Sequence, residues 1–225
     1  MVMIFGHRGA PGSAGYGENT LASFRKALKC GAHGLEFDVR RCGDGRIVVI
    51  HDDTIDRTTN GSGRVADFSY EELKQFDAGF GEPIPLLSDV LDQFGCSTCM
   101  LNIELKDPGL AEDIKKLLLE KRLERRVIVS AFDWNELRSL PPEVPIALLA
   151  DKLENLIATA RELGATAIHL RKDVVTPSLL AAAREARLRL HVWTINAPDE
   201  IASFRALGVD GIFSDFPERC LMSAS

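Results

Sequence analysis

Short apolar runs alternate with segments of helical periodicity along most of this 225-residue chain. The run Val2–His7 ends in polar residues, which is typical of a buried strand that opens into a loop. Residues 20–30 follow with apolar side chains at helical spacing, and Gly31 is well suited to end that helix. The same pattern predicts further strands at residues 34–39, 47–50, 99–106, 127–131, 145–149, 167–170, 190–195 and 211–214.

Helical periodicity separates most of these strands. The further helices are predicted at residues 87–94, 110–123, 134–140, 153–163, 177–186 and 198–207. Strands that alternate with helices form parallel βα units, so the chain belongs to the α/β class. About eight such units in this length predict a (β/α)8 TIM barrel, with a doubly wound open sheet as the alternative. The barrel is favoured because charged residues recur where several strands end, and TIM-barrel enzymes build their sites there.

Residues 52–86 interrupt this alternation. They are rich in Thr, Asn, Gly and Ser and show no sustained periodicity before a short predicted helix near residues 69–76. The stretch is too short to bury a core of its own, so we interpret it as a small insertion after the second βα region. Residues 1–225 are therefore expected to form a single domain.

Composition excludes several classes of partner. The chain is 45% hydrophobic with a formal net charge of -6, and no run of Lys and Arg residues is longer than a local pair. A nucleic-acid groove or a polybasic membrane patch would need a basic cluster, so neither is expected. No leader or long apolar stretch is recognisable, which predicts a cytoplasmic protein without stable membrane association. The five scattered cysteines favour reduced thiols, since the isolated Cys96-x-x-Cys99 pair lacks the partners of a zinc site.

Two strands carry charge on one face. Side chains alternate along a strand, so Glu36 and Asp38 lie opposite the apolar residues around them. The strand around Glu104 repeats this pattern, with Lys106 on the same face. Three carboxylates form an all-oxygen set suited to Mg²⁺ or Ca²⁺. The alternative is a buried network of ion pairs without a metal, in which Arg8, Arg40 and Lys106 neutralise the carboxylates.

His7 and His51 each end an apolar strand and precede a polar loop. A barrel would bring both to the rim that holds the carboxylates, which favours a paired general acid and base. Asp52 or another carboxylate could orient one imidazole. The remaining histidines are weaker candidates, of which His169 lies late in a strand.

A cation site with Arg, Lys and two histidines suits cleavage of a phosphodiester. Positive charge offsets the phosphate charge that repels a nucleophile, while one histidine takes a proton from the attacking oxygen and the other protonates the leaving alkoxide. No P-loop or Gly-x-Gly-x-x-Gly fingerprint follows a strand, and Ser130 has no nucleophile-elbow motif around it. Nucleotide-dependent chemistry and serine hydrolysis are therefore not expected.

Eight short motifs run from the first strand to about residue 217 and thus cover nearly the whole chain. The motifs are His7-Arg8-Gly9, Glu18-Asn19-Thr20, Glu36-x-Asp38, His51-Asp52, Arg57-Thr58-Thr59, Glu104-x-Lys106, Trp193-Thr194 and Asp210-Gly211-Ile212-Phe213-Ser214-Asp215-Phe216-Pro217. Their order resembles that of the glycerophosphodiester phosphodiesterases. One departure stands at Ile84-Pro85-Leu86-Leu87-Ser88, where such proteins commonly read Ile-Pro-Thr-Leu-Glu; it affects the expected start of a helix.

The resemblance implies a TIM barrel with an insertion after the second strand, and hydrolysis of glycerophosphodiesters to sn-glycerol 3-phosphate and an alcohol. It implies metal binding by Glu36, Asp38 and Glu104 and acid/base roles for His7 and His51. The substrate-binding residues that it implies are Arg8 and Lys106 on the phosphate, Asn19 in support of the site, and Phe132 and Trp193 as pocket lining.

Two other functions stay open at this point. A phospholipase acting on intact lipids would need an apolar lip at the barrel mouth, which the polar residues 52–66 do not offer. A non-catalytic phosphodiester-binding module could dispense with one histidine, whereas this chain keeps both. The expected partner is a small-molecule glycerophosphodiester, and the protein is expected to be a monomer or homodimer.

Overall fold

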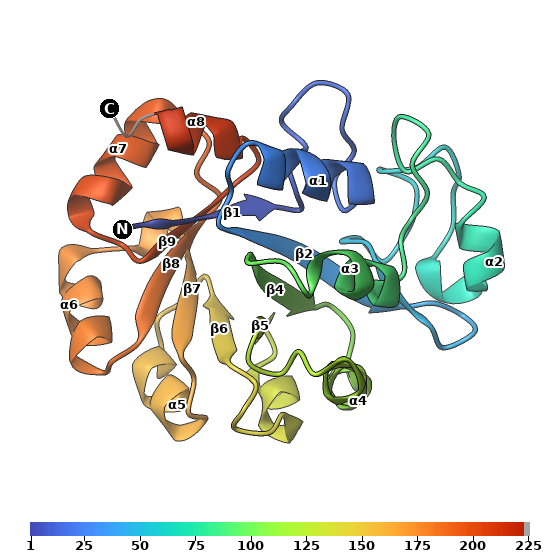
Figure 1. The fold of residues 1–225 in the computed structure, drawn as a ribbon. Coiled ribbons are helices and arrows are strands. Elements are labelled where there is room, and N and C mark those ends of the chain that lie inside the picture. Colours follow the sequence, from blue (N-terminus) through green and yellow to red (C-terminus); the bar gives the residue numbers. More distant parts are fainter. Residues whose placement is uncertain (223–225) are drawn as a thin grey trace.

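The computed structural model describes residues 1–222, and its centre is a closed barrel of parallel strands (Figure 1). Eight strands run parallel around the barrel, and β1 pairs with both β9 and β2, which closes it. The prediction of a (β/α)8 barrel is confirmed. The barrel strands are β1 (Met3–His7), β2 (Gly34–Arg41), β4 (Met100–Leu105), β5 (Val127–Ala131), β6 (Ile146–Ala150), β7 (Ala167–Arg171), β8 (Arg189–Trp193) and β9 (Gly211–Ser214).

Helices surround the barrel and cover its outer face (Figure 1). They are α1 (Leu21–Lys29), α3 (Leu87–Phe94), α4 (Leu110–Lys121), α5 (Leu156–Glu162), α6 (Pro177–Glu185), α7 (Pro198–Leu207) and α8 (Pro217–Met222). The start of α3 reflects the departure noted in the sequence, because Leu86 at its N-cap position makes no side-chain cap hydrogen bond. No helix among residues 1–222 has both the length and the apolar character that crossing a membrane would require.

The segment after β5 differs from the expected helix. Residues Trp134–Ser139 form a 3-10 helix, η2, and the chain is already extended at Leu140. Leu140 precedes Pro141, whose ring disfavours the helical region for the preceding residue, so the turn cannot continue. A second short 3-10 helix, η3 (Lys172–Val174), follows β7.

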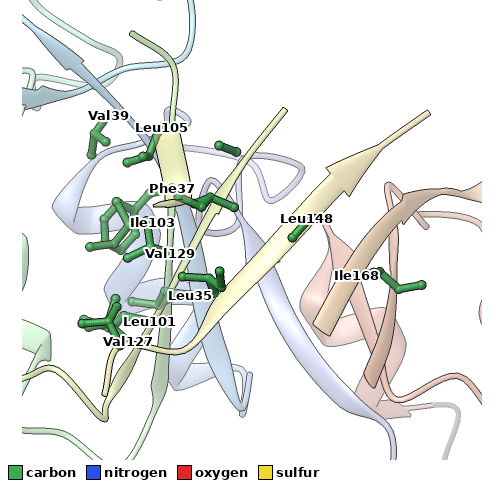
Figure 2. Packing of buried hydrophobic residues seen from close by; sticks show 14 of the residues in the cluster. Leu35, Phe37, Val39, Leu101, Ile103, Leu105, Val127, Val129, Leu148 and Ile168 are labelled. Atoms are coloured by element: carbon green, nitrogen blue, oxygen red, sulfur yellow. The ribbon is translucent and has the colours of Figure 1, made fainter. Parts of the chain in front are cut away.

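The main core lies between the barrel strands and the helices. Phe37 and Ile103, on neighbouring strands, are fully buried and pack in this layer with Leu35 and Val129 (Figure 2). Because side chains alternate along each strand, the residues between them point to the barrel interior. The outward apolar packing therefore fixes Glu36, Asp38 and Glu104 on the inner face, as the sequence pattern predicted.

The insertion is anchored to a hairpin beside the barrel. Strand β3 (Ile47–Val49) pairs antiparallel with the end of β2 and is not part of the closed barrel. The following residues hold a 3-10 helix, η1 (Val65–Asp67), and a single turn of helix, α2 (Tyr70–Leu73), shorter than the predicted helix. Their buried side chains, among them Ile55 and Leu73, form a small second cluster with Val48 of the hairpin.

Candidate active site

Three carboxylates from two adjacent strands meet inside the barrel at the end where the strands finish. Glu36 and Asp38 come from β2, and Glu104 lies beside Asp38 in the register of β4. One oxygen from each lies within 4.8 Å of the other two, and all three side chains are buried. The structure therefore brings the predicted ligand set together.

Two cationic side chains contact the carboxylate cluster, but they do not pair with all of its oxygens. Lys106 forms ion pairs with Glu104 and, at 3.2 Å, with Asp38, and Nε of Arg8 lies 3.3 Å from Asp38. Burial opposes the charge of Asp38, but Lys106 and Arg8 outweigh it and hold the pKa of this carboxyl below its usual value. Arg40, the third cation of the ion-pair alternative, instead pairs with Asp107 and donates to the carbonyl oxygen of His51.

Glu36 is the least compensated of the three carboxyls. Burial and the neighbouring Asp38 charge raise the pKa of Glu36 to about 8, and burial and the same charge also raise the pKa of Glu104. Oε1 of Glu36 has no hydrogen-bond partner among the described residues. A buried oxygen without a partner, within a set of three carboxylates, fits a hard divalent cation.

The backbone conformation at Arg8 directs its N–H group toward Glu36. Arg8 has a φ of 53°, in the left-handed region, and its backbone N–H donates to Oε2 of Glu36 at 2.9 Å. Gly9 follows with a φ of 94°, and a Cβ there would lie 2.4 Å from the hydroxyl of Ser23. Only glycine fits this turn, which explains why the His-Arg-Gly motif ends as it does.

His7 ends β1 and lies directly over the cluster. Its Nε2 is 3.9 Å from Glu36, and its Nδ1 lies 2.7 Å from Oδ1 of Asp215, which follows β9. Burial would lower the pKa of His7, but the hydrogen bond to Asp215 and the charge of Glu36 raise it. Asn196 donates to the other oxygen of Asp215 at 2.7 Å and holds this carboxylate in place.

His51 reaches the same rim from outside the barrel. The apolar strand that precedes His51 is not a barrel strand, because β3 runs antiparallel to β2 and returns the chain toward the rim, where the backbone N–H of Ile50 donates to the carbonyl oxygen of Asp38. Its Nδ1 lies 2.6 Å from Oδ1 of Asp52, which confirms that Asp52 can orient one imidazole. Burial lowers the pKa of His51, while Asp38 and Asp52 oppose that change.

Both imidazoles thus share one arrangement. A carboxylate accepts a hydrogen bond when the proton sits on Nδ1, and this leaves Nε2 available to exchange a proton with a substrate. His7 and His51 both line an open cavity beside Glu36 and Glu104, with about 410 Å³ of empty space when the solvent at its mouth is included. The two predicted acid/base residues therefore lie around a common space.

Three further residues implied by the resemblance lie in or beside the cavity. Asn19 donates to Oδ2 of Asp38 at 2.9 Å and so supports the carboxylate cluster. Phe132 and Trp193 form one wall, with their rings edge to face at 5.8 Å between centroids. His169 lines the cavity more deeply and stacks on His191, and burial lowers its pKa well below the usual value. A neutral His169 is a poor candidate for the acid or base.

Two contributors were given no role by the sequence analysis. Asp215 follows a barrel strand directly, so the rule that sites form at strand ends could have selected it. Asn102 precedes Glu104 on the same face and donates to Ser130, but its local sequence carries no sign of a role. The five cysteines, which were predicted to be reduced, are free thiols.

A barrel with an acidic cluster and two carboxylate-held histidines at the rim where its strands end has the architecture of a TIM-barrel enzyme. Comparison with known proteins narrows this class. The profile of the Glycerophosphoryl diester phosphodiesterase family matches residues 7–219, and this chain belongs to that family. The resemblance seen in the motifs is confirmed, and so is the predicted enzyme class, a glycerophosphodiester phosphodiesterase.

Individual relatives agree over nearly their whole length. The glycerophosphodiester phosphodiesterase of Caldanaerobacter subterraneus subsp. tengcongensis is 37% identical, with 96% of this chain and 95% of the relative covered. That of Bacillus altitudinis is 38% identical, with 98% and 97% covered. Among solved structures, an Oleispira antarctica phosphodiesterase in complex with the product sn-glycerol-3-phosphate superimposes with a TM-score of 0.86 at 29% identity, covering 98% of this chain and 96% of that one.

Proposed function

We propose that this protein hydrolyses glycerophosphodiesters to sn-glycerol 3-phosphate and an alcohol, with Mg²⁺ or Ca²⁺ held by Glu36, Asp38 and Glu104. The observation that carries the proposal is the placement of two imidazoles, each oriented by its own carboxylate, around a cavity that Glu36 and Glu104 of the acidic cluster also line. The product bound in the Oleispira antarctica relative supports the choice of substrate.

His7 and His51 carry the proton transfers in this proposal. One Nε2 accepts a proton from the attacking oxygen, and the other donates a proton to the alkoxide as it leaves. Their pKa values are shifted in opposite directions, which suits a pair with two different tasks. The attacking oxygen is that of water or, first, that of the neighbouring glycerol hydroxyl, which would give a cyclic phosphate that water then opens.

Positive charge holds the phosphate in place. Arg8 and Lys106 both line the cavity beside the carboxylates, where their side chains can contact the phosphate oxygens. When bound, the divalent cation would supply further charge neutralisation at the phosphate. The aromatic wall of Phe132 and Trp193 covers the apolar parts of the substrate and limits access of water.

Turnover of glycerophosphocholine is the direct test. We expect release of sn-glycerol 3-phosphate and choline, loss of activity on chelation, and recovery with Mg²⁺ or Ca²⁺. Activity that persists in chelator would contradict the metal site and support the network of internal ion pairs. Binding without turnover would identify a phosphodiester-binding module.

An intact phospholipid offered in parallel separates the remaining alternative. Cleavage of the lipid but not of glycerophosphocholine would show a phospholipase.

We propose that the enzyme acts in the cytoplasm on its small substrate, as a monomer or homodimer and as a single domain over residues 1–225. Gel filtration with light scattering would establish the oligomeric state.

A further inference from the structure

Arg57 joins two parts of the site that lie on different segments. Its guanidinium donates two hydrogen bonds to Glu18, both at 2.8 Å, and two to Asp52, at 2.7 and 3.0 Å. Glu18 also accepts from Nη1 of Arg8 at 2.8 Å, and Asp52 holds Nδ1 of His51 at 2.6 Å. A continuous chain of hydrogen bonds therefore runs from Arg8 to His51, with Arg57 at its centre.

We propose that Arg57 is a positioning residue for the phosphodiesterase reaction, fixing the His51 imidazole through Asp52 and the Arg8 guanidinium through Glu18. The inference rests on the proposed function and extends it to the insertion. Arg57 is not one of the described residues that line the cavity, so it acts through its neighbours rather than on the substrate.

The chemistry of the guanidinium suits this role. Its planar fork can give two parallel hydrogen bonds to each of two carboxylates, whereas a lysine offers a single point of charge. Asp52 is only one residue from His51 and is partly open to water, so an unanchored carboxylate could rotate away from Nδ1. The bonds from Arg57 keep the pKa of Asp52 well below its usual range, which keeps the carboxylate charged.

An ordinary surface ion pair would behave differently. The Arg57 side chain is 48% exposed, and exposed pairs contribute little to the stability of a fold. If stability were its only purpose, removing Arg57 would change thermal stability slightly and leave turnover unaltered. A positioning role predicts the same small change in stability but a clear loss of turnover.

Three substitutions test the proposal. Arg57→Met removes all four bonds, Arg57→Lys keeps the charge, and Arg64→Met is the control, because Arg64 is an exposed arginine of the same insertion. We expect Arg57→Met to lower kcat for glycerophosphocholine by about ten-fold or more, within the range that proton transfer by a side chain contributes. Arg57→Lys should recover only part of the loss, and Arg64→Met should retain the wild-type kcat.

The coupling between Arg57 and Asp52, and an NMR signal of His51, complete the test. In an Asp52→Asn background, Arg57→Met should cost less kcat than it does in the wild type, because the part of its effect that passes through His51 is already lost. The Nδ1 proton signal of His51 in NMR should be lost or exchange faster in Arg57→Met. Unchanged kcat, additive losses or an unchanged His51 signal would each overturn the proposal. Should the wild type fail to cleave glycerophosphocholine, the proposed function falls while the NMR signal still decides the role of Arg57.

Discussion

The carboxylate of Asp215 lies 2.7 Å from Nδ1 of His7, although 208 positions separate the two residues in the chain. They meet because β1 pairs with β9 when the barrel closes, so the last strand delivers a carboxylate to the first histidine. Closure of the barrel and assembly of this half of the site are therefore one event.

Asp215→Asn should lower kcat on the order of 10²-fold while leaving the fold intact. The amide can donate as well as accept, so it no longer selects the imidazole form with its proton on Nδ1. Asp199→Asn, at an exposed position in the first turn of α7, is the matched control and should retain activity. Equal kcat values for the two variants would exclude a role for the Asp215 charge.

His51→Ala should remove nearly all turnover without unfolding the protein. The side chain is 33% exposed and belongs to neither hydrophobic cluster, so little packing is lost. Steady-state kinetics and thermal melting, measured on the same sample, check the two halves of this expectation. Residual activity close to that of the wild type would show that His51 is neither the acid nor the base.

Glu36→Gln should stabilise the chelated protein and abolish its activity. Burial and the Asp38 charge raise the pKa of Glu36 to about 8, so folding without a metal must protonate this carboxyl, whereas the amide is already neutral. The amide also lacks the charge that would bind a cation. In thermal melts with chelator, the variant should therefore melt above the wild type. Addition of Mg²⁺ or Ca²⁺ should raise the melting temperature of the wild type more than that of the variant, and an equal rise would place the cation elsewhere.

Stability should fall as the pH drops below 6.5 because of His191. Burial lowers the pKa of this imidazole from 6.5 to about 3, so the unfolded chain binds a proton that the folded protein does not. The contribution is complete above pH 6.5 and is lost progressively toward pH 3. Between pH 7.5 and pH 5 the free energy of unfolding should fall by about 2 kcal/mol from this group alone.

Denaturant unfolding of the wild type and of His191→Gln at both pH values measures this term. The variant lacks the titrating group, so its free energy of unfolding should vary less with pH. The same dependence on pH in both proteins would assign the acid sensitivity to other groups.

The barrel and the carboxylate cluster could be predicted because they depend on short-range patterns. Alternation along β2 and β4 alone places Glu36, Asp38 and Glu104 on one face, and apolar packing of their neighbours fixes that face inward. The end of η2 at Ser139 also has a local cause, because Pro141 disfavours a helical conformation at Leu140. The periodicity of residues 134–140 does not reveal this effect.

The contacts that orient the histidines depend on long-range geometry. Asp215 reaches His7 only through the closed barrel, and His51 reaches the rim only because β3 turns back along β2. The bridge from Arg57 to Glu18 spans 39 positions and two loops. Periodicity carries no information on contacts between residues that lie far apart in the chain. The motifs could therefore suggest these residues but not their partners.

The antiparallel hairpin has a consequence for how this enzyme can diversify. His51 and Arg57 are presented by a segment that adds no strand to the closed barrel. The parts of residues 52–86 away from Asp52 and Arg57 can therefore be lengthened, shortened or exchanged without disturbing closure. The carboxylates and His7 stay with the barrel itself. Changes in the appended segment can therefore reach the site only through His51 and the residues that hold it, while the barrel part of the site stays the same.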